Sequence, residues 1–147
     1  MIALKQDEGM RYLCALIEHI SRTFQIDNPT VVRTLGKANL QRIYDHAEVF
    51  HCELLEAVTD GWHSRVHFPT GNIDKVSACP YKVPSVWDIG MTYANLIASL
   101  PKPPIDSLME VFESFLPEYL DNYRTAVFFR GDDFLRLSYA EGRILDL

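Results

Sequence analysis

Long hydrophobic runs are missing from this sequence, and so are clusters of basic residues and paired cysteines. No apolar stretch approaches the roughly 20 residues that a transmembrane helix needs. The first residues, Met-Ile-Ala-Leu-Lys-Gln-Asp-Glu, lack the basic start and the long apolar core of a secretory signal peptide. We therefore expect a cytoplasmic protein that has no contact with a membrane.

Positive charge is also scarce. The chain has 14 lysines and arginines among 147 residues, against 20 aspartates and glutamates, which gives a formal net charge of −6. The basic residues are scattered singly along the chain. Because the affinity for nucleic acids rests mostly on clustered lysine and arginine, no nucleic-acid partner is expected. The acidic excess would suit a basic partner, although it also serves plain solubility.

The cysteines do not form a disulfide framework. There are three of them, Cys14, Cys52 and Cys79, and an odd number without a Cys-x-x-Cys pair is not typical of a disulfide scaffold. Cys14 falls on an apolar helical face, where a free thiol behaves as a small hydrophobic residue. This usage indicates a reducing, cytosolic compartment.

Helical periodicity dominates the rest of the chain. The longest run with one clean helical period extends over residues 39–59, and no glycine or proline interrupts it. Its apolar residues recur three or four positions apart; they are Leu40, Ile43, Tyr44, Ala47, Phe50, Leu54, Leu55 and Val58. This pattern predicts the central helix of an all-α fold, with five to six helices around one core.

The remaining helices are predicted over residues 10–24, 28–36, 85–100, 106–127 with a break at Pro117, and 133–141. In the first of these, Tyr12 and Leu16 lie to the side of the apolar stripe, so this helix has more than one face to bury. Gly90 lies within the apolar stripe of residues 85–100. A glycine in mid-helix costs roughly 1 kcal/mol against alanine, which points to the close approach of another backbone.

The segment over residues 62–84 is the least regular part, because turn and breaker residues recur along it. Such a long irregular connection is uncommon in a compact domain. It either holds a short helix over residues 72–77 or serves as a functional or partner-binding loop. We expect a single helical domain over residues 1–147, and the connection also permits two subdomains of about 1–61 and 84–147.

Histidines are concentrated in the middle of the chain. Glu48 and His51 have the Glu-x-x-His spacing that binds metals in helical bundles, and loop ligands would complete a zinc site. No second copy of the motif is present for a di-iron site, and His51 lies on the apolar stripe, where a lone histidine is more often a core residue. A metal-binding protein or small enzyme is therefore the alternative interpretation, with a site formed by His46, His51, His63 and His67.

Three segments of the first half carry a family resemblance: "RYLCALIEHI", a short helix ending in "LGK", and "NLQRIYDHAEVFHCELLEAV". Over about residues 11–62 the chain resembles a family of small bacterial helical domains of unknown function. In that family a tyrosine and an apolar-histidine pair recur near the end of the long helix, as at Tyr44 and Phe50-His51 here. Members are often encoded beside ADP-ribosyltransferase-like toxins. The resemblance implies an antitoxin or accessory role and no catalytic residues.

The leading functional hypothesis is a non-enzymatic protein-interaction module without a cofactor. No catalytic constellation stands out, and the apolar and aromatic residues exceed what one buried face per helix accommodates. A protein partner or a second copy of the chain would bury the surplus. The candidate surface residues are Tyr12 and Leu16 on the first helix, Val49 on the polar back of the predicted central helix, and Trp62.

Overall fold

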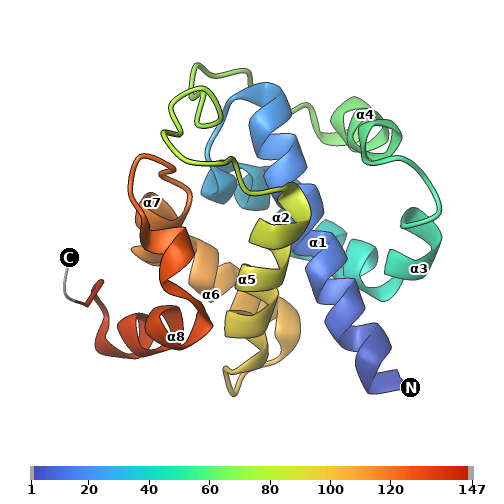
Figure 1. Cartoon of the computed structure of the whole chain (residues 1–147). Helices are drawn as coiled ribbons and strands as arrows, with labels where there is room; N and C mark the ends of the chain where they lie inside the picture. The colour runs from blue at the N-terminus through green and yellow to red at the C-terminus, as the bar shows by residue number, and fades with distance from the viewer. Residues whose placement is uncertain (1, 146–147) are drawn as a thin grey trace.

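The structure, a computed structural model, describes the backbone of residues 2–145 and the side chains of residues 8–145. The described part contains no strand, so the all-α prediction is confirmed, with more helices than the five to six expected. In chain order the elements are α1 (Ile2–Phe24), α2 (Asn28–Asp45), α3 (Ala47–Phe50), α4 (Leu55–Val66), α5 (Val86–Ala98), α6 (Pro104–Glu113), α7 (Leu116–Leu120), the 3-10 helix η1 (Val127–Arg130) and α8 (Asp132–Glu141) (Figure 1). None of these helices, over the described range, combines the length and apolar character needed to cross a membrane.

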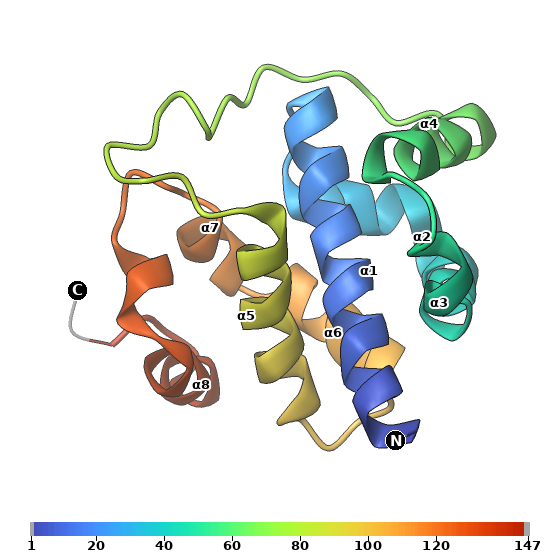
Figure 2. The same ribbon diagram turned by 45° about the vertical axis from the view of Figure 1, so that its right-hand side comes forward.

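The helix at the centre of the fold is α1. Every residue from Tyr12 to Ile17 is at most 2% exposed, and a helix that is buried all round needs neighbours on every side. In both views α1 runs between α5 on one side and α3 and α4 on the other, and α2 crosses behind it (Figures 1 and 2). The prediction that this helix buries more than one face is confirmed.

The predicted central helix over residues 39–59 is wrong, because this segment is divided among α2, α3 and α4. His46 (φ −114°, ψ 24°) and Leu54 (φ −66°, ψ 144°) leave the helical conformation. A straight helix of this length would be about 30 Å long. The two bends allow both Ala47 and Trp62 to be buried in the core. The helical spacing of the apolar residues is real, but these residues are divided among α2, α3, α4 and the link before α4.

Close packing of α5 against α1 depends on Gly90. A Cβ atom at this position would lie 2.8 Å from both the carbonyl oxygen of Arg11 and the backbone nitrogen of Ala15. The predicted approach of another backbone is thus confirmed. A capping box starts α5: the backbone nitrogen of Asp88 donates to Ser85 Oγ at 3.0 Å, and the backbone nitrogen of Ser85 donates to Asp88 Oδ2 at 3.3 Å. The first turn of α5 is therefore fixed beside α1.

The irregular connection covers residues 67–85, because α4 extends further than expected. The short helix considered over residues 72–77 is not formed; this stretch holds only a turn. The backbone nitrogen of Gly71 donates to the carbonyl oxygen of Phe24 at 2.9 Å. A Cβ atom on Gly71 would lie 2.4 Å from the carbonyl oxygen of Gln25, so a glycine lets the connection follow the end of α1 this closely (Figure 2).

The core draws on the segments before and after this connection. Buried apolar side chains of α1, α2, α5, α6 and α7 belong to one contiguous cluster. Within it, the rings of Tyr93 and Phe112 stack with centroids 4.4 Å apart. The predicted break at Pro117 is confirmed, because α6 ends at Glu113 and α7 begins at Leu116.

Candidate functional site

The structure does not bring the four predicted metal-binding histidines together. His46 and His51 flank the short helix α3 and are both exposed. His63 packs on the ring of Phe24, with centroids 4.5 Å apart, and its ring lies 6.0 Å from that of His67. Within residues 8–145, no group of three or more histidine, cysteine, aspartate or glutamate side chains is spaced to hold a metal ion.

The four predicted surface residues differ in exposure. Tyr12, Leu16 and Trp62 are at most 3% exposed, whereas Val49 is 65% exposed. Leu16 and Trp62 serve the core here, so a contact surface that included them would require this packing to open. Tyr12 is different, because its ring borders a hollow at the surface.

This hollow, called the aromatic hollow below, lies between α1, α3 and the first turn of α5. Its volume is about 710 Å³, and its lining residues are Glu8, Gly9, Arg11, Tyr12, Ala47, Glu48, His51 and Trp87. Three of these contribute one aromatic wall: the ring centroid of His51 lies 5.4 Å from that of Tyr12 and 5.5 Å from that of Trp87. The Tyr12 and Trp87 centroids are 6.2 Å apart. The wall thus combines side chains from three separate parts of the chain.

Two buried hydrogen-bond donors at the aromatic hollow have no partner. They are the hydroxyl of Tyr12 and Nε of Arg11, and neither meets an acceptor in the described part of the chain. Burial, with a contribution from Glu53, raises the pKa of Tyr12 to about 12. The hydroxyl is therefore protonated at neutral pH and can donate, as the guanidinium always can. Each unpaired donor costs about 1–3 kcal/mol, so a ligand that brought acceptors would recover a sizeable free energy.

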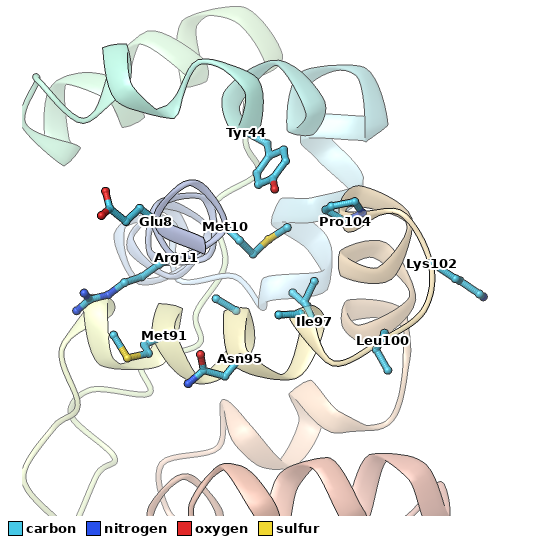
Figure 3. Close-up of a pocket in the computed structure, with 12 residues that line it drawn as sticks. Glu8, Met10, Arg11, Tyr44, Met91, Asn95, Ile97, Leu100, Lys102 and Pro104 are labelled. Carbon is cyan, nitrogen blue, oxygen red and sulfur yellow. The ribbon is translucent and has the colours of Figure 1, made fainter. Parts of the chain in front are cut away.

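A second hollow adjoins the aromatic hollow and shares Glu8 and Arg11 with it. Its volume is about 440 Å³. Figure 3 shows Met10 pointing between Tyr44 and Ile97, while Arg11 and Glu8 extend from α1 away from Met10. Glu8 and Arg11 thus lie where the two hollows meet, and the lining of the second hollow also includes Lys102.

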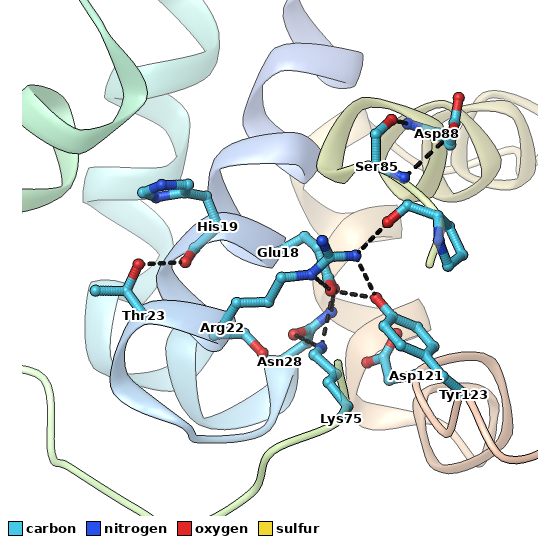
Figure 4. Close-up of polar contacts among 12 residues, drawn as sticks. Glu18, His19, Arg22, Thr23, Asn28, Lys75, Ser85, Asp88, Asp121 and Tyr123 are labelled. Carbon is cyan, nitrogen blue, oxygen red and sulfur yellow. Dashed lines mark hydrogen bonds and ion pairs between the residues drawn. The ribbon is translucent and has the colours of Figure 1, made fainter. Parts of the chain in front are cut away.

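A buried polar cluster lies at the other end of α1. Its centre is Glu18, whose side chain is fully buried. Lys75 Nζ donates to Glu18 Oε1 at 3.0 Å, and Arg22 Nε donates to Glu18 Oε2 at 2.8 Å. Asn28 Nδ2 also donates to Glu18 Oε1, at 3.0 Å, and the hydroxyl of Tyr123 donates to Oε2 (Figure 4). Four donors from four segments therefore surround one carboxylate.

This polar cluster is explained by its structural role. Burial acts to raise the pKa of Glu18, but Lys75 and Arg22 outweigh it and the pKa is lowered. Lys75 also donates to Asn28 Oδ1 at 3.2 Å, so the irregular connection is tied to both α1 and α2. Arg22 Nη2 donates to the carbonyl oxygen of Pro84 at 2.7 Å, which fixes the other end of the connection. The cluster fastens residues 67–85 to the core.

Asp121 lies beside this cluster and is only half satisfied. Its Oδ1 accepts a hydrogen bond from the Tyr93 hydroxyl at 2.8 Å, whereas its Oδ2 is buried without a partner in the described structure. Burial raises the pKa of Asp121 to about 7, with Lys75 acting in the opposite direction. A carboxyl with such a pKa can exchange a proton near neutral pH. Apart from Tyr93, no described side chain that could act as a nucleophile or transfer a proton forms a hydrogen bond with Asp121.

Sequence reasoning missed Arg11 and Trp87 at the aromatic hollow, and Lys75 and Asp121 at the cluster. Arg11 precedes a tyrosine on a helix that reads as plain core, and Trp87 lies in a capping box. Their roles depend on which helices meet, for which a single sequence carries little signal. The one local signal was Gly90, which indicated that another backbone approaches the first turns of α5.

Comparison with protein-family models, with curated proteins and with solved structures finds no match to this chain. The chemistry of the site is therefore argued from its geometry alone. The aromatic hollow offers two unpaired donors, one of them cationic, beside a wall of three rings. Such a site binds a group that carries hydrogen-bond acceptors next to an apolar or planar surface.

Proposed function

We propose that the chain is a cytosolic, non-enzymatic protein-interaction module that binds one partner polypeptide at the aromatic hollow. In a bacterial two-gene system it would serve as the antitoxin or accessory partner. The observation that carries the proposal is the pair of unpaired donors, Arg11 Nε and the Tyr12 hydroxyl, at a hollow with an aromatic wall. A folded domain rarely leaves buried donors unsatisfied, and each such group calls for an explanation.

Exposed apolar side chains near the aromatic hollow support a polypeptide partner. Val49 is 65% and Leu54 73% exposed, and they flank His51 in sequence on the segment that closes the hollow. Isolated exposed apolar residues need no explanation. Here two of them are close in sequence to His51, which lines a hollow with unmet hydrogen-bond donors, and exposed apolar residues around such a centre are typical of a protein interface.

Charge favours a basic partner over a second copy of the chain. Glu8 lines the aromatic hollow, and Glu53 is close enough to Tyr12 to act on its pKa. The whole chain carries a formal net charge of −6. A homodimer through this face would bring like charges together, whereas a basic polypeptide would be attracted to it.

Co-expression with the products of the adjacent genes tests the proposal. The wild-type chain should co-purify with one of them as a defined complex, and a variant with Val49→Ser and Leu54→Ser should lose it. Leu137→Ser is the matched control, because Leu137 is 52% exposed on α8, an element that contributes no residue to the lining of the hollow, whereas Val49 and Leu54 lie within three residues of His51 in the sequence. The control variant should retain the complex.

Light scattering on the purified chain separates the two kinds of partner. A monomer that forms a complex only with a neighbouring gene product agrees with the proposal. A stable homodimer that dissociates in the Val49→Ser and Leu54→Ser variant would show that the same face serves self-association instead. Failure of every adjacent product to bind a monomeric chain would contradict the proposal in both forms.

A further inference from the structure

We infer that the aromatic hollow takes the C-terminal residue of the partner polypeptide, with the terminal carboxylate on Arg11 and Tyr12 and the terminal side chain against the aromatic wall. This inference rests on the proposed function and names the part of the partner that the hollow recognises.

The two unpaired donors select a carboxylate. Nε of Arg11 is buried without a hydrogen-bond partner in the described structure, so this edge of the guanidinium is available to a ligand that reaches it. The Nε–H edge of a guanidinium pairs with the two oxygens of a carboxylate, and such charge-assisted bonds are about twice as strong as neutral ones. The Tyr12 hydroxyl, which is protonated at neutral pH, supplies a further donor. The main-chain carbonyl of an internal residue has a single uncharged oxygen, so it matches the donors of Arg11 and Tyr12 less well than a carboxylate does.

The remaining lining fits the rest of a terminal residue. The backbone N–H of that residue is a donor, and Glu8 on the lining offers an acceptor for it. Its side chain would lie against the ring of Trp87, in the place that the His51 ring takes in the free protein, where the two ring centroids are 5.5 Å apart. The volume of about 710 Å³ is within the range of small-molecule sites, roughly 300–1,000 Å³, so a terminal residue fits and a folded element does not.

Other anions fit less well. A phosphate carries more negative charge than a carboxylate, and Glu8 and Glu53 near the hollow would repel it. A C-terminal residue carries both a negative carboxylate and an N–H donor. The lining offers the donors of Arg11 and Tyr12 to the carboxylate and the acceptor of Glu8 to the N–H. Recognition of a terminal carboxylate by clustered donors is one of the recurring modes of peptide binding.

Entry to the donors requires a movement of His51. The Tyr12 hydroxyl is buried, and the exposed His51 ring packs 5.4 Å from the Tyr12 ring. His51 follows α3, where the chain leaves the helical conformation before α4, so its side chain can rotate outward without disturbing a helix. The ligand's ring would then occupy the position beside Trp87.

Three small probes test the inference by titration calorimetry on the full chain. They are N-acetyl-L-phenylalanine, which mimics a C-terminal residue; its amide, which mimics an internal residue; and free L-phenylalanine. The acid should bind at least tenfold more tightly than the amide, because the amide lacks the charge-assisted pair with Arg11. In Arg11→Gln the affinity for the acid should fall to that of the amide, and in Tyr12→Phe the affinity for both probes should fall while the acid remains the tighter ligand.

The other outcomes overturn the inference. Equal affinity for the acid and the amide would indicate an internal segment as the ligand. Tighter binding of free phenylalanine would indicate an amino-acid site. No binding of any probe, or unchanged binding of the acid in both variants while far-UV circular dichroism shows both to be folded, would remove the hollow as the site.

Amidation of the partner's C-terminus separates this inference from the proposed function. If the complex with a neighbouring gene product forms and amidation weakens it at least tenfold, both stand. If the complex forms and amidation leaves it unchanged, the inference fails while the interaction function stands. If the acid binds the hollow but no adjacent product does, the proposed function fails.

Discussion

Replacing Tyr12 by phenylalanine should stabilise the free protein, which is the opposite of what removing a buried polar group usually does. Tyr12 is 2% exposed and its hydroxyl has no partner in the described structure. In the unfolded chain the same hydroxyl is solvated by water. Folding therefore costs the desolvation of this group without a compensating bond, and Tyr12→Phe removes that cost.

The size of the gain follows from two opposing effects. An unsatisfied buried hydroxyl costs about 1–3 kcal/mol. Removing its oxygen leaves a space smaller than a methylene group, whose burial is worth about 0.8 kcal/mol. The net increase in the free energy of unfolding should be about 1 kcal/mol and at most about 2 kcal/mol. For a chain of this size, 1 kcal/mol corresponds to a rise in Tm of about 2–4 °C.

Tyr93→Phe is the matched control. Tyr93 is as deeply buried as Tyr12, but its hydroxyl donates to Asp121 Oδ1 at 2.8 Å. Its removal would leave both carboxylate oxygens of Asp121 unpaired, so it should lower the free energy of unfolding by about 1–3 kcal/mol. Urea unfolding measures both variants, and unchanged m values would show that the native and denatured states are otherwise comparable.

The pH dependence gives an independent check. The pKa of Tyr12 is raised above its ordinary value, so the folded state holds this proton more tightly than the unfolded state. The wild type should lose stability as the pH rises from about 10 through 12, and Tyr12→Phe should lose less, because only the contributions of the other tyrosines with raised pKa values, Tyr93, Tyr123 and Tyr139, remain. Below pH 9 the difference between the two proteins should be constant. If Tyr12→Phe destabilised the protein as Tyr93→Phe does, the hydroxyl would have a partner and the reasoning would be refuted.

Three further predictions concern the framework. Gly90→Ala should lower the free energy of unfolding by about 1–3 kcal/mol, because its Cβ would meet the α1 backbone. Gly61→Ala, whose Cβ would have no atom within 4 Å, should raise the free energy of unfolding by up to about 1 kcal/mol. Thermal unfolding measures both variants. Lys75→Met should cost about 3 kcal/mol in urea unfolding, because it leaves the buried Glu18 short of a partner, and should speed proteolysis of residues 67–85. Asp121→Asn should raise the free energy of unfolding at pH 8 by up to about 4 kcal/mol. The pKa of Asp121, about 7 in the folded protein, lies above the ordinary value, so the stability of the wild type falls as the pH rises. The gain from Asp121→Asn should therefore fade towards pH 3.5.

Local signals in the sequence predicted local structure well. The helix predicted over residues 85–100 matches the start of α5, Pro117 indicated a helix boundary, and Gly90 indicated the close approach of another backbone. Each of these depends on residues that are neighbours in sequence or on a missing Cβ. The all-α class followed from the same local periodicity.

The bends that build the aromatic hollow were not predictable from the same signals. His46 and Leu54, where the predicted helix over residues 39–59 breaks, are neither glycine nor proline. They bend because α3 and α4 pack around α1, and this tertiary constraint outweighs the helical period. One consequence is that His51, expected in the core, is exposed at the rim of the hollow.

The unpaired donors also explain how such a small hollow would discriminate between ligands. A ligand that supplies acceptors to Arg11 and Tyr12 recovers the desolvation cost already present in the free protein. A ligand of the same shape without acceptors leaves both donors unpaired and must also displace solvent from the hollow. Sites built to satisfy a polar group reject the analogue that lacks it far more strongly than apolar pockets reject a change of size. The stability that Tyr12 costs the free protein is, on this reasoning, one origin of the selectivity of the hollow, so Tyr12→Phe should bind the acid probe more weakly while unfolding at a higher temperature.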